Sequence, residues 1–415
     1  MKLTNLDKKY IKKFKLDQNS FDMKNTLKEV LKYPPAMVLA KAIENAHLAM
    51  NGGKIRIYKN QVYCLTYPAF MTVRKTKTNK IIFEPDEDSF YDKFNRYLGQ
   101  DLTNKKLFVY RTGGLGDIIF TQSVIKQIKE KYPSCIITYS TMVNNLPILT
   151  LWEKGLIDRV TPMPFTKEVL EEHDYHLTFE GVIERCKESE KENCYDMYNR
   201  AANMEFDPKK YNPVLKTDIR LKNLLKDKVL PNTVALQMRA SSVLRCVHKK
   251  VIKEIINKLI ELNFNVGLLD SPNNAVHIDK MIKEFEFDIV TESKIQNFSS
   301  EQKTIAHGAA ILDMCVGAIT TDSAFSHISA GLNKPCVTIY GPFTGDVRSK
   351  YYEKADWIGP KKGWNKCGKY PCFFHDNRIR QCVYIQNNIH PGCMTDIDID
   401  ELITKFLKLL ENEKK

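Results

Sequence analysis

The feature that most constrains the fold is a strand, a glycine-rich turn, a helix and a second strand that follow one another within residues 106–140. KLFVY at 106–110 is an apolar run typical of a short buried strand, and RTGGLG follows it directly. The helix expected after the turn ends at Tyr132-Pro133, and CIITYS at 135–140 is the next strand. The predicted apolar face of the helix consists of Ile118, Ile119, Val124, Ile125 and Ile128. Such a unit forms a right-handed parallel crossover, so we expect a parallel α/β domain.

A second α/β series begins near Pro231. TVALQM at 233–238 and NVGLLD at 265–270 predict strands, and the amphipathic segment 248–262 between them predicts a helix. Residues 310–342 close the series with a strand, a turn, a helix and a strand. Two such series in a chain of 415 residues indicate an α/β protein with two Rossmann-like domains facing a cleft, at 105–228 and 229–395. Residues 396–415 predict a capped C-terminal helix that packs back on the first of these domains.

The first 104 residues precede this pattern and are expected to form an α+β extension. Residues 23–53 predict two helices, split at Pro34-Pro35 and closed by Gly52-Gly53. KIRIYKNQVYCLTY at 54–67 predicts a hairpin around Lys59-Asn60, because β-branched and aromatic residues flank a turn-prone pair. PDED at 85–88 is interpreted as a solvated turn, so no catalytic signature is expected in the extension.

The glycine turn raises a chemical question, because Gly113, Gly114 and Gly116 are followed by the anionic Asp117. A P-loop would need a Gly-Lys-Ser/Thr triplet, whereas an aspartate in that place would repel phosphates. A dinucleotide site would need G-x-G-x-x-G spacing and an acid after the second strand, and the sequence has neither. Two interpretations stay open. Asp117 is either a carboxylate kept deprotonated at the mouth of the cleft by the helix N-terminus, or a helix cap.

The second α/β series offers a phosphate site in TTDSAFSHISAGLNKP at 320–335. A strand ends and a helix begins there, and the free N–H groups and dipole of a helix start attract a diphosphate. Two arginines on the loop after a neighbouring strand could clamp phosphate oxygens. The candidate donor ligands are Arg239, Arg245, Asp322, Ser323, Ala324 and His327. The alternative is that Asp322 and Ser323 only cap the helix and that His327 is a core histidine.

Three segments together resemble glycosyltransferase family 9, the heptosyltransferase-like enzymes. GGLGDIIFTQSVIKQIKEKYP at 113–133 is similar to the family's N-terminal turn and helix, and LQMRASSVLRCVHKK at 236–250 is similar to its basic loop. TDSAFSHISAGLNKPCVTIYGP at 321–342 is similar to the family's Asp-(Ser/Thr)-Gly-x-x-His segment and is the most specific of the three. The resemblance covers about residues 105–410, so the first hundred residues lie outside it.

The resemblance implies a GT-B fold and inverting, metal-independent transfer of a sugar from a nucleotide diphosphate sugar such as an ADP-heptose-like donor. It implies that Asp117 is the general base and that the three glycines hold the backbone close to the reacting centre. It assigns the donor phosphates to the six candidate ligands. The sequence departs from the family at Ala324, which replaces a glycine, and at Arg245, which stands where lysine is common.

Charge and hydropathy bear on the partners. The net charge of +13 favours an anionic partner. The leading acceptor is a glycan or a lipid-linked saccharide; the alternatives are a modified base of nucleic acid, or no transfer at all in a protein that only binds a nucleotide sugar or nucleic acid. No apolar run approaches the roughly 18–20 residues of a membrane span, and no apolar segment follows the basic N-terminus. A cytoplasmic location is therefore expected, and the charge would also suit peripheral association with an anionic surface.

The C-terminal part contains two further motifs. Cys367, Cys372, Cys382 and Cys393 could hold a structural zinc, although their spacings are not those of common zinc modules. Reduced core cysteines or a disulfide are the alternatives. DIDID at 396–400 contains Asp-x-Asp twice, as in metal-dependent transferases, but aspartates at a helix start also cap it. No metal is expected in catalysis. The basic and aromatic segment 345–380 is interpreted as a solvated loop over a small core, with a nucleic-acid or glycan platform as the alternatives.

Overall fold

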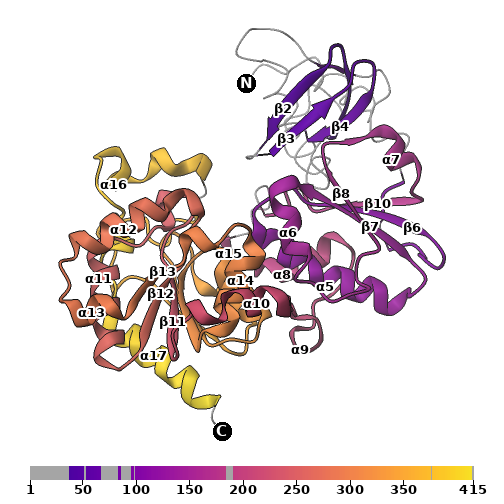
Figure 1. Cartoon of the computed structure of the whole chain (residues 1–415). Coiled ribbons are helices and arrows are strands. Elements are labelled where there is room, and N and C mark those ends of the chain that lie inside the picture. The colour runs from indigo at the N-terminus through magenta and orange to yellow at the C-terminus, as the bar shows by residue number, and fades with distance from the viewer. Residues whose placement is uncertain are drawn as a thin grey trace.

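The structure, a computed structural model, describes residues 37–50, 53–66, 83–85, 95–97, 99–183, 190–374 and 376–413. These residues form an extension and two α/β domains, with the extension beside the first α/β domain (Figure 1). The expected α/β fold with parallel sheets is confirmed. In the part of the chain that is described, no helix is both long enough and apolar enough to cross a membrane.

The first α/β domain is built on a four-stranded parallel sheet in the order β10-β6-β7-β8. Its strands are β6 (Lys106–Tyr110), β7 (Ile136–Met142), β8 (Arg159–Met163) and β10 (Tyr175–Thr178). The predicted helix is α5 (Leu115–Lys131), and every residue of its predicted apolar face is buried. The other helices are α6 (Leu146–Leu149), α7 (Lys167–Glu171), α8 (Cys194–Ala201) and α9 (Pro208–Tyr211).

The second α/β domain contains a six-stranded parallel sheet in the order β13-β12-β11-β14-β15-β16. Its strands are β11 (Thr233–Gln237), β12 (Asn265–Leu268), β13 (Ile295–Asn297), β14 (Gly317–Thr321), β15 (Cys336–Ile339) and β16 (Ala355–Ile358). Its helices are α10 (Ile219–Leu225), α11 (Lys249–Glu261), α12 (Ala275–Glu284), α13 (Ile289–Ser293), α14 (Ile305–Met314), α15 (Ala324–Gly331), α16 (Val383–Gln386) and α17 (Ile399–Asn412). The connection α10 precedes the sheet in sequence but packs against α14.

The C-terminal helix α17 is capped by Asp398, whose side chain accepts a hydrogen bond from the N–H of Glu401. The prediction that this helix packs back on the first α/β domain is wrong. Its buried residues Leu402, Ile403 and Phe406 belong to the core of the second domain, and α17 contacts α11, β15 and β16 (Figure 1). An amphipathic pattern shows that a helix has an apolar face, but it does not say which sheet covers that face.

The extension differs from its prediction. The second of its two expected helices is instead a pair of strands, β1 (Met37–Ala42) and β2 (Ala46–Met50). Alanine, leucine and methionine favour a helix intrinsically, but in this segment pairing decides: β1 lies antiparallel between β4 (Val62–Thr66) and β5 (Phe83–Pro85). The first expected helix and most of PDED lie outside the described residues.

The hairpin predicted around Lys59-Asn60 is also wrong in its pairing. A turn is present there, and Asn60 has a positive φ of 69°. However, β3 (Gly53–Ile57) pairs with β2, while β4 pairs with β1 and with β9 (Phe165–Thr166) of the first α/β domain. The β4–β9 pairing and a shared cluster that includes Leu39, Cys64 and Phe108 join the extension to that domain.

The two α/β domains share one continuous hydrophobic core. Helix α15 of the second domain packs against α5 of the first, and these helices meet near the centre of Figure 1. Phe120 and Tyr195 from the first domain lie in the same buried cluster as Ile328 and Tyr352 from the second. Polar contacts cross the same boundary, since the Tyr195 and Tyr352 hydroxyls lie 3.1 Å apart. The ends of α5 and α15 are therefore fixed relative to each other.

Candidate active site

A cavity of about 1230 Å³ lies between the two α/β domains. Its walls come from the segments that follow strands of both parallel sheets, namely β6, β7, β10, β11, β12, β13, β14 and β15. This is the edge where parallel α/β sheets bind ligands. The structure brings nearly all of the predicted site residues to this cavity. They are Gly114, Gly116, Asp117, Arg239, Arg245, Asp322, Ser323, Ala324 and His327. Gly113 lies behind the wall, where its carbonyl oxygen accepts a hydrogen bond from Asn145 Nδ2 at 2.9 Å.

Asp117 lies in the first turn of α5, and both of its oxygens have partners. Oδ2 accepts a hydrogen bond from the N–H of Gly114 at 2.9 Å and lies 3.3 Å from Nη2 of Arg111. Oδ1 accepts a hydrogen bond from the Tyr198 hydroxyl at 3.2 Å. The side chain keeps 24% of its surface exposed to the cavity. Asp117 therefore caps the helix, as one interpretation expected, and it also faces the cleft, as the other did.

The surroundings of Asp117 stabilise its charged form. Burial acts to raise its pKa, but Arg111, Arg348, the Tyr198 hydroxyl and the Gly114 N–H act in the opposite direction. The pKa of Asp117 consequently lies below the ordinary value of an aspartate, as expected for a carboxylate that accepts hydrogen bonds near arginines. At neutral pH the group is a carboxylate that can accept a proton.

Arg111, which no sequence motif indicated, forms an ion pair with this carboxylate. Its side chain is 1% exposed and lies between two acids, with Nη1 3.5 Å from Oε2 of Glu180 and Nη2 near Asp117. Glu180 in turn accepts a hydrogen bond from the N–H of Thr112, at the start of the turn. The sequence signal was the arginine that directly follows β6, but nothing in the sequence showed that it folds back under the turn.

The glycines of the turn make room for side chains rather than for phosphate. A Cβ atom on Gly113 would collide with the guanidinium of Arg111. A Cβ atom on Gly116 would lie 2.7 Å from Cδ2 of His327, which belongs to the second domain. Two of the three glycines are therefore required for close approach, one to the arginine that supports Asp117 and one across the domain boundary.

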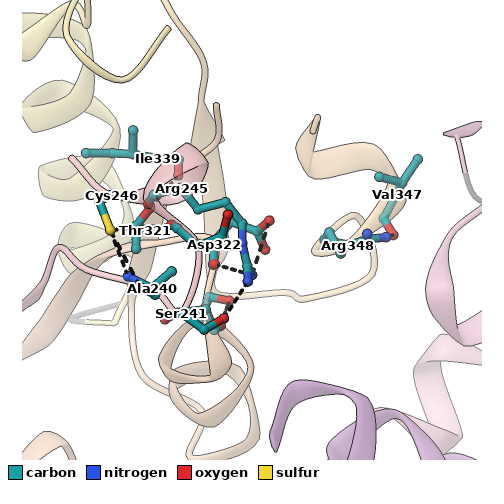
Figure 2. Close-up of polar contacts among 12 residues, drawn as sticks. Ala240, Ser241, Arg245, Cys246, Thr321, Asp322, Ile339, Val347 and Arg348 are labelled. Atoms are coloured by element: carbon teal, nitrogen blue, oxygen red, sulfur yellow. Dashed lines mark hydrogen bonds and ion pairs between the residues drawn. The ribbon is translucent and has the colours of Figure 1, made fainter. Parts of the chain in front are cut away.

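The opposite wall is the start of α15. Ser323 is the N-cap of this helix, and its hydroxyl oxygen accepts from the N–H of Phe325 at 3.3 Å while its proton is donated to Gln237. The carbonyl oxygen of Asp322 accepts from Nη1 of Arg245 at 2.9 Å, and the Asp322 carboxylate lies 3.9 Å from the same nitrogen (Figure 2). The predicted capping alternative thus holds for Ser323, and its hydroxyl proton is already committed to Gln237.

The two arginines predicted to bind phosphate both have carboxylate partners. Arg245 also donates to the Ser241 hydroxyl at 3.0 Å (Figure 2). Arg239 lies 3.2 Å from Oδ2 of Asp270, an acid just beyond β12 that is only 9% exposed. Both arginines nevertheless line the cavity and remain partly exposed, so a ligand can reach them.

His327 is buried, and its Nδ1 lies 2.7 Å from the hydroxyl of Tyr352. Its ring also meets that of Phe120 edge to face, with 4.7 Å between the centroids. Burial lowers the pKa of His327 to about 4, more than the nearby Asp322 and Asp117 raise it, so the ring is neutral at pH 7. His327 therefore joins the two domains as a buried core residue, as one interpretation expected, and it also forms part of the cavity wall.

The four C-terminal cysteines, Cys367, Cys372, Cys382 and Cys393, lie near one another. Burial, followed by the neighbouring thiols Cys372, Cys382 and Cys367, raises the pKa of Cys393 to about 12. Among the residues that the structure describes, no group of three or more histidine, cysteine or acidic side chains is arranged to hold a metal ion. All four are free thiols in the structure.

The DIDID motif belongs to the end of the chain and not to the cavity. Asp398 caps α17, Asp400 lies in its first turn, and Asp396 accepts a hydrogen bond from Nζ of Lys366 at 2.8 Å. These residues are absent from the cavity wall. The interpretation of the motif as a helix start is therefore confirmed for Asp398.

Comparison with known proteins agrees with the resemblance seen in the sequence. The family model of glycosyltransferase family 9 (heptosyltransferase) matches residues 200–376. No curated protein sequence matches. The fold is similar to that of the ADP-heptose lipopolysaccharide heptosyltransferase II of E. coli, with a TM-score of 0.58 at 15% identity over 75% of this chain and 100% of that one.

Two further solved structures share the fold. The family 9 glycosyltransferase of Veillonella parvula has a TM-score of 0.57 at 13% identity, and the match covers 75% of this chain and 99% of that one. The iron-containing dodecameric glycosyltransferase TibC of enterotoxigenic E. coli has a TM-score of 0.53 at 12% identity. That match covers 91% of this chain and 96% of TibC, so it extends into the N-terminal extension.

Proposed function

Because the chain is a glycosyltransferase similar to family 9 (heptosyltransferase) and has a GT-B fold, we propose that it transfers a sugar from a nucleotide diphosphate sugar to a hydroxyl group with inversion at the anomeric carbon. The observation that carries the proposal is the position of Asp117. Its carboxylate, with a lowered pKa, faces a cavity whose opposite wall is the start of α15. A proton acceptor and a phosphate-binding helix start thus flank one space.

In the proposed reaction the acceptor oxygen attacks the anomeric carbon from the side of Asp117. The bond from the anomeric carbon to the phosphate oxygen breaks, and its electron pair stays on the departing nucleoside diphosphate. The acceptor's proton passes to Oδ1 of Asp117, because Oδ2 is held by the Gly114 N–H and Arg111. The N–H groups at the start of α15, with Arg245 and Arg239, stabilise the diphosphate as its charge develops.

The donor is proposed to be ADP-heptose-like. This part rests on the resemblance, since the E. coli enzyme that shares the fold is an ADP-heptose heptosyltransferase. The cavity is large enough for a nucleotide sugar and the reacting end of an acceptor, because ligand sites are typically about 300–1,000 Å³.

The acceptor is proposed to be a hydroxyl of a glycan or a lipid-linked saccharide. On the first-domain side the described wall of the cavity carries one charged side chain, Asp117 itself, among residues such as Leu115, Asn144 and Pro147. A nucleic-acid acceptor would need cations for its phosphates near the reacting group. The wall therefore favours an uncharged acceptor group, and nucleic acid ranks second despite the basic net charge. A protein that only binds nucleotide sugars is the third candidate.

The proposed chemistry needs no divalent ion, because fixed N–H dipoles and arginines offset the charge of the leaving group. A structural zinc at the four C-terminal cysteines stays a prediction, and no step of the reaction depends on it. TibC, which shares the fold, is an iron-containing protein, so metal analysis of the purified chain should measure both zinc and iron.

The test is a screen of nucleotide diphosphate sugars with mass spectrometry of the nucleotide released and of any glycosylated product. With the donor found, Asp117→Asn should lower the transfer rate by about 10²–10⁴-fold while donor affinity changes little. Asp196→Asn is the matched control, because Asp196 on α8 bonds to Tyr351 and lies outside the cavity wall. Near-normal turnover of Asp117→Asn would reduce Asp117 to a helix cap. Repeating the wild-type assay after a chelator tests the metal-free mechanism.

A further inference from the structure

A third arginine of the cavity, Arg348, differs from the two predicted from the sequence. It follows the short turn Gly345–Val347 after β15, and its side chain is buried, with 7% of its surface exposed. It lines the same cavity as Asp117 and Asp322. In Figure 2 it lies on a separate segment, apart from the Arg245–Asp322 pair. No part of the sequence resemblance pointed to this residue.

The guanidinium is held in place by groups that do not neutralise it. Nη1 donates to Sγ of Cys194, which belongs to the first domain, at 2.8 Å, and to the carbonyl oxygen of its own neighbour Val347 at 3.2 Å. The ring of Phe343 lies 4.6 Å from the guanidinium carbon. Contacts from both domains therefore fix this side chain at the boundary between them.

Arg348 differs from the other arginines of the site in having no carboxylate partner among the described residues. Arg111, Arg239 and Arg245 each have a carboxylate oxygen within 4.0 Å. In the described part of the chain, Arg348 has none, and its Nε and Nη2 have no hydrogen-bond acceptor. A buried charge without a counter-ion is costly, and binding of an anion would offset this cost. Thiol sulfur is a weak acceptor and does not replace one.

The position of Arg348 identifies the anion. Burial acts to lower the pKa of Arg348, but Cys194, Asp322, Tyr340 and Asp117 outweigh it, so the cation is stable in the cavity. Its charge lowers the pKa of Asp117, and the Asp322 carboxylate at the start of α15 acts on Arg348, so the guanidinium is within electrostatic reach of both walls of the cavity that all three residues line. In the proposed reaction, the bond that breaks lies between the base and the helix start that holds the phosphates. The group between them is the phosphate attached to the sugar.

We propose that Arg348 binds the sugar-linked phosphate of the donor and stabilises the charge that this phosphate gains when the anomeric bond breaks. The assignment rests on the proposed function. Nε and Nη2, the free edge of a planar guanidinium, suit two oxygens of one phosphate group. Arg245 and Arg239, which already hold carboxylates, then complete the site for the rest of the nucleotide.

The test compares nucleoside diphosphate with nucleoside monophosphate, because only the diphosphate carries the phosphate that Arg348 contacts. Calorimetry of the wild-type chain with ADP, GDP, UDP and CDP first selects the nucleotide. Arg348→Met should then weaken binding of that diphosphate by about 10-fold or more, as for the loss of a charged hydrogen bond, while binding of the corresponding monophosphate changes by less than about 2-fold. Lys350→Met is the matched control, since this exposed lysine of the same segment is absent from the cavity wall, and neither affinity should change.

The outcomes separate the two proposals. Equal losses for the diphosphate and the monophosphate, or no loss for either, would overturn the role of Arg348 while leaving the proposed function intact. If the wild-type chain binds none of the nucleotides, the proposed function fails and this assignment fails with it. If Arg348→Met does not fold, Arg348→Lys takes its place. Arg348→Lys keeps the charge but loses the planar pair of donors. It should therefore weaken diphosphate binding several-fold while leaving monophosphate binding nearly unchanged, and equal losses for both ligands, or no loss for either, would count against the proposal.

Discussion

The two oxygens of Asp117 are in different environments, and this difference decides how the residue can act. Oδ2 is bound to the turn through Gly114 and to Arg111, so it fixes the carboxylate in one orientation. Among the described residues, Oδ1 accepts its hydrogen bond from the Tyr198 hydroxyl, a donor that can rotate away. One oxygen thus provides the helix cap and the other is available to a substrate. Arg111 lies between Asp117 and Glu180, and its charge lowers the pKa of Asp117.

Replacing Arg111 by lysine should therefore change the pH dependence of transfer. A lysine has one nitrogen in place of the two that contact Asp117 and Glu180, so its interaction with Asp117 should be weaker. Burial should then raise the pKa of Asp117 above its wild-type value. If Asp117 is the base, the acid limb of the wild type lies below the ordinary aspartate value of about 3.9, because the pKa of Asp117 is lowered. In Arg111→Lys the acid limb of kcat/KM should move toward neutral pH. Asp117 should affect stability in the same direction. Because its pKa is lowered in the folded protein, its contribution to the free energy of unfolding is present above its unfolded pKa and is lost as the pH falls through its folded pKa.

The measurement is the profile of kcat/KM between pH 4 and pH 8. Arg159→Lys serves as the control, because Arg159 is an exposed residue of β8 in the same sheet, and its acid limb should not move. An unchanged limb in Arg111→Lys would mean that Arg111 does not set the pKa of Asp117.

The sequence indicated Asp117 as a candidate site residue, but it did not indicate the residues that contact its carboxylate. Asp117, Ser323 and His327 lie in local patterns, a turn before a helix and a strand before a helix, and those patterns fold largely as they read. Arg111, Tyr198 and Arg348 act through contacts between segments that are far apart in the chain, such as the 81 residues that separate Tyr198 from Asp117. Only the folded chain shows such contacts, and no local spacing encodes them.

At the scale of elements, the glycine turn couples α5 to α15. Because a Cβ atom at position 116 would lie 2.7 Å from Cδ2 of His327, the two helices approach closely only with glycine there. Replacing Gly116 by alanine should lower the free energy of unfolding by about 1–3 kcal/mol, the usual cost of overpacking. Removing the imidazole should relieve the collision, so Gly116→Ala and His327→Ala together should cost less than the sum of the two single changes.

Urea unfolding of the wild type, both single variants and the double variant measures this coupling. If the decreases in the free energy of unfolding add, the turn can move away from α15 without loss of stability. The close contact would then not hold the two helices together. The Tyr352 hydroxyl loses its partner in His327→Ala with or without the alanine at 116, so that loss cancels in the cycle.

Elements were predicted best where a local signal and the fold agree. The apolar runs of β6, β7 and β11 and the amphipathic faces of α5 and α11 folded as expected, because parallel strands and their covering helices are buried on predictable sides. The helix predicted in this part of the extension is wrong over residues 37–50, because an alanine-rich segment is compatible with either a helix or a strand. Pairing decides for the strand, since β1 pairs with β4 and β5 and β2 pairs with β3. The Gly52-Gly53 pair was expected to end a helix, but Gly53 is the first residue of β3.

At the scale of the whole molecule, the two α/β domains behave as one packed unit in the region below the cavity. Gly331 accepts a backbone hydrogen bond from the N–H of Leu215 at 2.8 Å, and the side chain of Leu215 covers Gly331 so closely that a Cβ there would lie 2.6 Å from Leu215 Cγ. Leu215 also lies in the cluster that runs from Trp152 in the first domain to Tyr352 in the second. A GT-B enzyme is often pictured as two bodies on a hinge, but here the boundary is filled by side chains from both.

A shared core predicts that the two domains unfold together. Three tryptophans are present, so Trp152 and Trp357 can each be left as the single fluorophore by changing the others to phenylalanine. Trp152 is buried in the first domain and Trp357 lies on β16, at the edge of the second sheet. The denaturant transitions reported by the two tryptophans should coincide, as in a two-state protein.

A variant at the boundary tests the same point. Leu215→Ala removes side-chain packing there and should lower the free energy of unfolding by about 2–5 kcal/mol. If the core is continuous, both midpoints fall together. A midpoint that falls for only one tryptophan would show two independent domains whose contact adds little to stability, and the rigid placement of Asp117 opposite α15 would then need a bound substrate.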